Sequence, residues 1–453
     1  DRDILIVTGG DAGFEGEDCE TDGLKYRKAP LTHHNACSLR RLFPFTAPRP
    51  VLSNDRTVGV GDRLGIACPG HIRVFKKYDA FPIFAQQSIR ELNLTGRTFD
   101  DVLDCVTFAV YREGFRRGFG ADGDHLKKPE EVEYALGCGY TMITLDCSEH
   151  INNDAANMSD KEVAEQYAKR YQTGGELEKV YPGKKFDIGE DVVLTFDESE
   201  FKRSVLIYKD AIDFACGIYD KYIRNNPVDF EISIDETITP TTPLQHFFVA
   251  NELTRRGIRF ATMAPRFCGE FQKGVDYIGN LGQFEREFAV HAAIARHFGY
   301  KISVHSGSDK FSVFPAVGRL TKGRFHLKTA GTSWLEAMKL VAMKDAGLYR
   351  EIHTYALSVF EEARKYYHVT TQLNRIPDIK TLSDKELPQL FSHHDARQLI
   401  HITYGLILNA RNPDGSYRFR DRLYRLWSEH AEDYAQMLEK HIGKHLEMLY
   451  KYI

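Results

Sequence analysis

Residues 300–333 read YKISVHSGSDKFSVFPAVGRLTKGRFHLKTAGTS, and they contain two short strand patterns with matching ends. In residues 301–305, branched apolar side chains alternate with others, so that His305 lies on the polar face at the end of the pattern. In residues 324–329, the same alternation places His326 opposite the apolar side chains. Each pattern then breaks into a glycine-rich turn, SGSD or TAGTS. Polar groups at the carboxyl ends of such strands are where parallel α/β sheets and barrels carry their chemistry.

The same rhythm of short apolar strands that end in polar or glycine residues repeats through most of the chain. Between the strand patterns lie helical ones, such as residues 205–222, where apolar side chains recur every three or four positions. Eight strands that alternate with helices predict an α/β fold, a (β/α)8 barrel of the TIM type. The predicted strands are residues 63–68, 80–87, 114–125, 141–150, 229–236, 258–266, 300–306 and 324–329.

Three segments flank or interrupt the predicted catalytic barrel, which spans residues 57–343. Residues 1–56 predict a separate N-terminal element. Their opening, DILIVTGGDAGFEG, resembles a strand that feeds a nucleotide-binding loop, but the glycine fingerprint is incomplete, so we expect a structural strand followed by a surface loop. Residues 151–197 form a long insertion after the fourth strand, and we expect a lid because they leave the carboxyl end of that strand. Residues 344–453 lack strand patterns and predict a C-terminal helical lobe.

Composition and charge exclude several classes of protein. The chain has 453 residues, 42% of them hydrophobic, which suffices for a large core. Its net charge of -4 without a long basic run argues against nucleic acid or an anionic membrane as a partner. No apolar run approaches the roughly 18 residues of a membrane span, and the eight cysteines include no C-x-x-C motif. We therefore expect a cytoplasmic protein that acts on a small-molecule substrate. We also expect the protein to form homo-oligomers through its C-terminal helices.

Three histidines on predicted barrel strands indicate a metal site. His125 ends the third strand, His305 ends the seventh, and His326 lies in the eighth. Because barrel strands converge on one mouth, their imidazoles can reach one divalent cation, which can be zinc, manganese, iron, nickel or cobalt. Three protein ligands leave positions open for water or substrate oxygens. The alternative is that each histidine is a buried donor with a partner inside the protein.

Carboxylates supply the second requirement for catalysis. In the fifth predicted strand, FEISIDE, the isoleucines should face the helices, so that Glu231 and Asp235 face the barrel interior. Burial raises the pKa of a carboxyl group and suits it to acid work, whereas a cationic neighbour lowers it and suits it to base work. We predict Glu231 and Asp124 as the catalytic acid and base. The alternative for Glu231 is an internal ion pair with Lys328 or Arg266.

Further polar groups near strand ends predict substrate contacts. Amides suit hydroxyl groups, and lysine and arginine can clamp a carboxylate. Together these groups describe a polar, polyhydroxylated and acidic small molecule as the substrate. The candidates are Gln86, Gln87, Lys127, Arg266, Lys310 and Lys328.

Seven runs of sequence resemble the tagaturonate/fructuronate epimerases of bacterial hexuronate catabolism, a family related to tagatose 4-epimerase activity. In chain order they are GDRLGIACPGHIRVFK, FPIFAQQSIRE, GFGADGDHLK, FEISIDETITPTTP, HSGSDKFSVFPAVGR, FHLKTAGTSWLEA and RQLIHITYG. The resemblance implies a metal-dependent isomerase that interconverts two keto-uronates differing at one hydroxyl-bearing carbon. It also implies Asp124 and Glu231 as the acid/base pair and His125 and His305 as metal ligands. Glu270, in RFCGEF, is the alternative to His326 as the third ligand.

The chemistry of these two substrates limits the mechanism. In ketose numbering they differ at C4, which is β to the ketone at C2, so the C4 proton is not acidified. A retro-aldol route avoids this difficulty: the base takes the C4 hydroxyl proton, the C3–C4 bond breaks, and the aldehyde rotates before the bond forms again. A hydride shift through the ketone is the competing mechanism. A metal-dependent aldolase-type lyase and a non-enzymatic sugar-acid-binding barrel are the competing functions.

Overall fold

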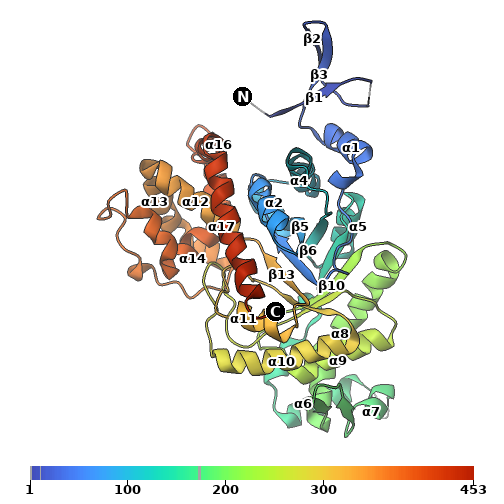
Figure 1. Ribbon diagram of the computed structural model, residues 1–453. Helices are drawn as coiled ribbons and strands as arrows, with labels where there is room; N and C mark the ends of the chain where they lie inside the picture. The colour runs from blue at the N-terminus through green and yellow to red at the C-terminus, as the bar shows by residue number, and fades with distance from the viewer. Residues whose placement is uncertain (1–2, 11, 172–174) are drawn as a thin grey trace.

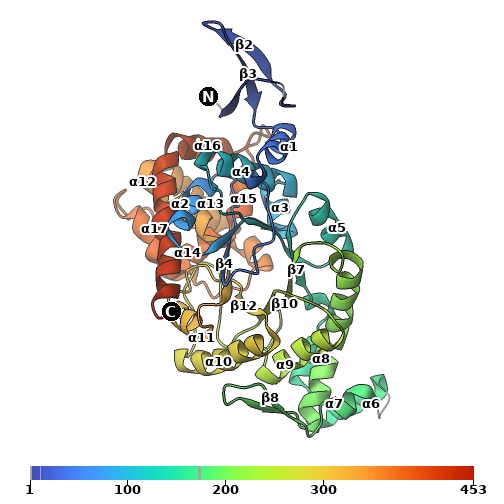
Figure 2. The same cartoon turned by 45° about the vertical axis from the view of Figure 1, so that its right-hand side comes forward.

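A closed barrel of eight parallel strands forms the centre of the computed structural model, which describes residues 3–10, 12–171 and 175–453. Strands that follow one another along the chain are neighbours in the barrel, and the last pairs with the first. Helices surround the strands on the outside (Figures 1 and 2). The predicted (β/α)8 barrel is therefore confirmed. Its strands are β4 (Arg56–Val60), β5 (Phe81–Ser88), β6 (Gly120–Leu126), β7 (Met142–Asp146), β10 (Asp229–Ile234), β11 (Thr262–Pro265), β12 (Lys301–Val304) and β13 (Phe325–Thr329).

The outer helices begin and end where the local sequence supplies the caps. The helix α4 begins with a capping box, in which the Thr98 and Asp101 side chains bind each other's backbone N–H groups. It ends at Gly114, and α10 ends at Gly299, both in the left-handed conformation that glycine adopts readily. These helices are α2 (Cys68–Lys77), α3 (Ile89–Thr95), α4 (Phe99–Glu113), α5 (Pro129–Gly137), α8 (Glu198–Ile218), α9 (Pro243–Arg255), α10 (Leu281–Phe298) and α11 (Phe314–Leu320).

The first barrel strand differs from the prediction. The strand is β4, and residues 63–67, predicted as its body, form a turn before α2. The Asp62 carboxylate accepts hydrogen bonds from the backbone N–H groups of Leu64, Gly65 and Ala67, which removes these donors from any strand ladder. Because proline is favoured in the first turn of a helix, Pro69 in CPGH then supports a helix rather than a strand.

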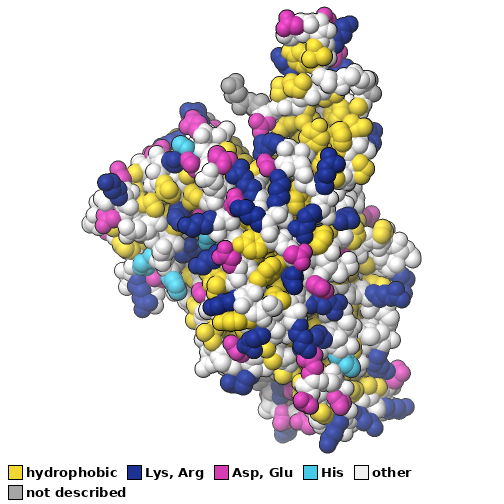
Figure 3. All heavy atoms as spheres, in the orientation of Figure 1, with side chains coloured by type: hydrophobic (Ala, Val, Ile, Leu, Met, Phe, Trp, Pro, Cys, Tyr) yellow, Lys and Arg dark blue, Asp and Glu magenta, His cyan; other side chains and the backbone are white. Residues whose placement is uncertain are grey.

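Residues before β4 form a small sheet and a helix that project from the barrel (Figures 1 and 2). The sheet has the antiparallel order β1-β3-β2 and leaves Ile4, Ile6 and Leu24 exposed. Figure 3 shows hydrophobic side chains on this projecting part. The elements are β1 (Ile4–Thr8), β2 (Glu17–Thr21), β3 (Leu24–Pro30) and α1 (His33–Leu42).

The insertion after β7 packs against the outside of the barrel. The hydroxyl of Tyr181 donates to Glu252 at 2.7 Å, and the Phe186 ring lies 4.8 Å from that of Phe247; both partners belong to α9. None of its described residues lines the cavity at the barrel mouth. The lid position expected for residues 151–197 is therefore corrected, because aromatic side chains fix the segment to outer helices. It contains α6 (Asp160–Arg170), α7 (Glu176–Val180), β8 (Lys185–Asp187) and β9 (Val193–Thr195).

Helices after β13 build a second hydrophobic core beside the barrel. Trp334 and Trp427 lie at its centre, with ring centroids 6.2 Å apart. The last helix, α17, runs back along α2 and α11 and so ties this lobe to the barrel (Figure 1). Among the described residues, no helix has the length and apolar content needed to cross a membrane. The helices are α12 (Thr332–Lys344), α13 (Ala346–Ala363), α14 (His394–Ile402), α15 (Tyr404–Asn409), α16 (Arg420–Glu429) and α17 (Ala431–Tyr450).

Candidate active site

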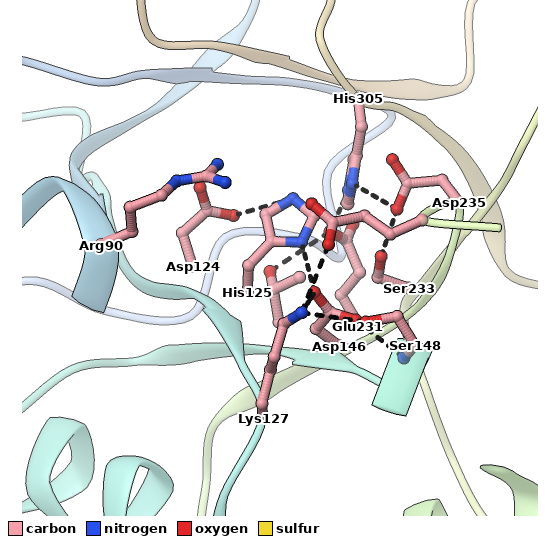
Figure 4. A network of polar contacts seen from close by, with 12 residues as sticks. Arg90, Asp124, His125, Lys127, Asp146, Ser148, Glu231, Ser233, Asp235 and His305 are labelled. Carbon is pink, nitrogen blue, oxygen red and sulfur yellow. Dashed lines mark hydrogen bonds and ion pairs between the residues drawn. The ribbon is translucent and has the colours of Figure 1, made fainter. Parts of the chain in front are cut away.

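A cavity of about 630 Å³ opens at the carboxyl ends of the barrel strands. Its walls come from the segments that follow six strands, together with residues 366–368 of the helical lobe. Polar side chains dominate the side nearest the barrel, where Asp124, His125 and His305 meet (Figure 4). Lys328 lines the same part of the cavity and contacts Asp124. This is the end of the barrel at which TIM-type enzymes hold their active sites.

Two histidines and one aspartate come together at the bottom of this cavity. One ligand atom from each of His125, His305 and Asp235 lies within 4.8 Å of the others. A register shift in β6 and a left-handed φ of +52° at His125 turn this side chain toward the cavity. Asp124 and His125 can therefore both line the cavity although they are adjacent in sequence.

Each histidine of this group has a carboxylate behind it. His125 Nδ1 lies 3.3 Å from Asp146, and His305 Nε2 lies 2.7 Å from Glu231 (Figure 4). These contacts leave His125 Nε2 and His305 Nδ1 directed toward the cavity. The buried His305 Nδ1 makes no hydrogen bond, but it lies 3.3 Å from an Asp235 oxygen. A carboxylate on the outer nitrogen is the usual support of a metal-binding histidine. The two nitrogens and Asp235 can thus supply three ligands for a cation.

Lys328 lies below this group and contacts three carboxylates. Its Nζ is 2.7 Å from Asp122, 2.7 Å from Asp124 and 2.9 Å from Glu231. Burial works to raise the pKa of Asp124, but the positive charges of Lys328, His125 and His305 together outweigh it and lower this pKa to about 2. Burial dominates at Asp122 and raises its pKa to about 7. Asp124 is therefore the ionised carboxylate of this trio that faces the cavity.

Glu231 lies deeper than predicted for a substrate-facing acid. Its carboxylate is fully buried, does not line the cavity, and accepts hydrogen bonds from Thr144, Thr262 and His305. Against the effect of burial, Lys328 and then His305 hold the pKa of Glu231 well below its usual range. The structure thus shows the internal ion pair with Lys328, which was the alternative interpretation of this residue.

The predicted third metal ligand, His326, does not join the group. It lies beside Thr57 of the adjacent strand β4, and its Nδ1 is 2.9 Å from the Thr57 hydroxyl. Because it lies inside β13, its side chain points into the barrel interior, whereas His305 follows the end of β12. Asp235, rather than His326, is the third candidate ligand beside His125 and His305. The alternation in FEISIDE already placed Asp235 on the inner face, one residue beyond its strand, and this signal could have identified it.

Glu270, the alternative third ligand, also lies outside the group. It lies 3.8 Å from Arg266 and 3.7 Å from His368 at another part of the cavity wall. Arg266 itself lines the cavity as predicted for a substrate contact, but it already contacts Glu270 and the Thr237 carbonyl.

The two predicted glutamine contacts have different surroundings. Gln86 lines the cavity, and its buried Oε1 has no hydrogen-bond partner, so it can accept a bond from a ligand. Gln87 is its neighbour on β5 and does not line the cavity. Successive side chains of a strand point to opposite faces, which accounts for this difference.

Two lysines predicted as carboxylate clamps have structural roles. Lys310 is fully buried and donates to the backbone carbonyls of Gln272, Val275 and Ser308. Burial lowers the pKa of Lys310 to about 7. The predictions for Lys310 and Lys127 are thus corrected, since neither lines the cavity.

The ammonium of Lys127 has partners of its own beside the barrel mouth. It lies 3.0 Å from the Ser148 hydroxyl, 3.3 Å from Glu236 and 3.5 Å from Asp146. Its charge is therefore balanced by carboxylates of the protein. Two cations that sequence analysis missed, Arg90 and Lys273, do line the cavity. They lie on α3 and in the segment between β11 and α10, outside the strand-end pattern used for prediction.

Comparison with known proteins shows which family the chain belongs to. The family model for tagaturonate epimerases matches residues 6–449. A tagaturonate/fructuronate epimerase from Thermotoga maritima is 44% identical over 98% of this chain and 92% of its own length. The fructuronate-tagaturonate epimerase UxaE from Cohnella laeviribosi, in native and glycerol-complexed crystal structures, has a TM-score of 0.96. It is 52% identical, with 99% of this chain and 92% of that chain covered. The chain belongs to the tagaturonate epimerase family.

Proposed function

We propose that this protein interconverts D-tagaturonate and D-fructuronate by epimerisation at C4 in ketose numbering, with the help of a divalent cation. The observation that carries this proposal is the pair of imidazole nitrogens that face Asp235 beside the ionised Asp124. The names of the two relatives supply the substrates, and the family membership supplies the reaction class. A polar cavity of about 630 Å³ suits a six-carbon sugar acid.

The residues at the bottom of the cavity fit a divalent cation. His125 Nε2, His305 Nδ1 and an Asp235 oxygen would hold it, with Asp146 and Glu231 fixing the two imidazole rings from behind. Two nitrogens and one oxygen suit zinc, manganese, iron, nickel or cobalt. When bound, the cation supplies positive charge that stabilises negative charge on substrate oxygens.

Asp124 is the group best placed to take the proton from the C4 hydroxyl. It lines the cavity, and its ion pair with Lys328 keeps it ionised at neutral pH. Glu231 shares the Lys328 ammonium with Asp124 but does not reach the cavity surface. We therefore assign Glu231 an indirect role, in which it and Asp124 share the positive charge of Lys328 and the proton from the substrate stays on Asp124.

The retro-aldol route requires one fragment to rotate inside the cavity. Once Asp124 holds the hydroxyl proton, the C3–C4 bond breaks and the C4 aldehyde rotates before the bond forms again on the other face. The unpartnered Gln86 Oε1 can accept a hydrogen bond from a substrate hydroxyl and so orient one fragment. Tight retention of both fragments is what separates an epimerase from an aldolase.

The test is proton NMR of D-tagaturonate in deuterated water with chelator-treated protein and with the same protein reloaded with each metal. We expect fructuronate only after reloading, without deuterium on carbon, as both the retro-aldol and the hydride-shift routes require. Free three-carbon products would instead identify an aldolase-type lyase. No turnover with any divalent cation would favour a sugar-acid-binding barrel.

We also infer a cytoplasmic location from the state of the thiols. All eight cysteines are free, three of them buried, as is common in a reducing compartment. Expression of the intact gene product followed by cell fractionation tests this inference, and recovery outside the cytoplasm would contradict it.

A further inference from the structure

The charged side chains around the cavity fall into two classes. Four lysine and arginine side chains line the cavity, and two of them already have a carboxylate partner within the protein. Lys328 contacts three carboxylates, and Arg266 lies 3.8 Å from Glu270. Arg90 and Lys273 differ, because neither has a carboxylate within ion-pair distance among the described residues. Their positive charge is therefore available to a ligand.

Both side chains are positioned by contacts that leave their charge free. Lys273 is half-buried, and its Nζ donates to the Ser306 hydroxyl at 2.9 Å, next to His305. Arg90 lies at the cavity rim, where its guanidinium packs 4.9 Å from the centre of the Tyr367 ring and points toward the residues of the mouth (Figure 4). These contacts restrict both side chains without neutralising them.

The two cations also influence each other. Burial, and then the positive charge of Arg90, lower the pKa of Lys273. Like charges held near one another are costly, and an anion between them removes this cost. Arginine offers paired N–H donors and lysine a point charge, and a carboxylate can bind both.

We propose that Arg90 and Lys273, with the Ser306 hydroxyl, bind the substrate carboxylate and set the preference for keto-uronates over neutral ketohexoses. This assignment rests on the proposed function. In ketose numbering the carboxylate is C6, two carbons from the reacting C4. Asp124, which takes the C4 hydroxyl proton, lines the same cavity as Arg90 and Lys273.

The experiment compares kcat/KM for D-tagaturonate and for D-tagatose, in which a hydroxymethyl group replaces the carboxylate. We expect Arg90→Met and Lys273→Met each to lower kcat/KM for the uronate about 10- to 100-fold, mainly through KM. The value for tagatose should stay within about threefold. Arg90→Lys and Lys273→Arg, which keep the charge, should recover part of the loss.

Matched controls separate a lost carboxylate contact from general damage. Arg73→Met and Lys322→Met remove cations that pair with Glu432 and Glu190 on the outer surface, so both substrates should be unaffected. Arg266→Met removes the cavity cation that already pairs with a glutamate. If that variant alone lost the preference for the uronate, the carboxylate site would belong to Arg266 and the present assignment would be wrong.

A binding measurement makes the result independent of turnover. Calorimetric titration with D-galactonate and with galactitol compares a sugar acid with its neutral counterpart. The wild-type preference for galactonate should shrink about tenfold or more in both methionine variants. Equal losses for both ligands, or no loss for the acid, would overturn the assignment. A wild-type protein that binds galactonate through these residues but epimerises nothing would overturn the proposed function alone.

Discussion

Two groups of histidine and aspartate side chains use the same residue types for different purposes. The first, at the barrel mouth, is His125, His305 and Asp235, and the second is Asp309, His441 and His445. In both, the possible ligand atoms lie within 4.8 Å of one another. Proximity alone would therefore make each a candidate metal site.

The groups differ in how many of their polar atoms already have partners. Asp309 contacts His441 and lies 2.6 Å from Arg397 of α14, while its backbone N–H donates to His445 Nε2 at 3.0 Å. His445 Nδ1 in turn contacts the His441 carbonyl at 2.9 Å. At the mouth, by contrast, the cavity-facing His305 Nδ1 makes no hydrogen bond, and its near neighbour, an Asp235 oxygen 3.3 Å away, is itself a candidate ligand. Free ligand atoms, rather than residue types, distinguish a binding site from a structural ion-pair network.

The largest expected effect is that of removing a ligand at the mouth. His305→Ala should lower kcat/KM for the uronate by about 10³-fold or more, roughly 4 kcal/mol of transition-state stabilisation, because the bound charge is lost. Metal content by mass spectrometry and turnover by NMR check this. The matched variant His445→Ala should retain the metal. Loss of metal from His445→Ala but not from His305→Ala would reverse the roles of the two groups.

Asp124 should be needed for chemistry but not for metal binding. Asp124→Asn keeps the shape of the side chain and removes its basicity, so kcat should fall about 10²- to 10³-fold while metal content stays at the wild-type level. Because the pKa of Asp124 is lowered to about 2, the wild-type base stays ionised at all pH values above that. Its titration should thus produce no acid limb in a pH profile between 5 and 8. A variant that lost its metal would identify Asp124 as a ligand instead.

The carboxylates behind the histidines should have intermediate effects. Asp146→Asn keeps a partner for His125 Nδ1 but removes the charge, which should weaken metal affinity or activity about 10- to 100-fold. Glu336→Gln is the control, since Glu336 lies 3.2 Å from His441 in the second group. Chelator competition measures the metal affinity of both. Equal weakening in the two variants would remove the distinction between the groups.

Periodicity predicted the parts of the site that depend on strand ends. Barrel strands all deliver their carboxyl ends to one mouth, so the strand ends alone predicted that His125, His305 and Asp124 lie there. Alternation could not predict that the adjacent Asp124 and His125 both face the cavity, because that depends on the register shift in β6. The same logic failed where a side chain competes with the ladder, as Asp62 does before α2. It also failed for the insertion, because its place depends on the distant Phe247 and Glu252.

The sequence also could not show which charged side chains already have a partner within the folded protein. In the sequence, the predicted lysines look equally suitable to bind a substrate carboxylate. In the structure, the Lys310 ammonium donates to backbone carbonyls and the Lys328 ammonium pairs with carboxylates of the protein. Arg90 and Lys273 gave no sequence signal, because being unpaired is a property of the folded chain. Glu231 illustrates both points, since alternation placed it inside the barrel but could not show that Lys328 and His305 already occupy its oxygens.

The second group, Asp309, His441 and His445, should affect stability rather than activity, and we expect its effect to be the smallest of those predicted here. Burial lowers the pKa of His441, but Asp309 and Glu336 outweigh it and raise this pKa to about 9, against about 6.5 when unfolded. A raised folded-state pKa gives stability that is complete below about pH 6.5 and is lost as the pH rises through 9. Between pH 6 and 9.5, the unfolding free energy of the wild type should therefore fall roughly 2 kcal/mol more than that of His441→Gln. Denaturant titrations at both pH values measure this difference. The variant should keep its metal and its turnover, because His441 lies outside the cavity at the mouth. An identical pH dependence in the two proteins would mean that the Asp309 contact does not hold the proton on His441.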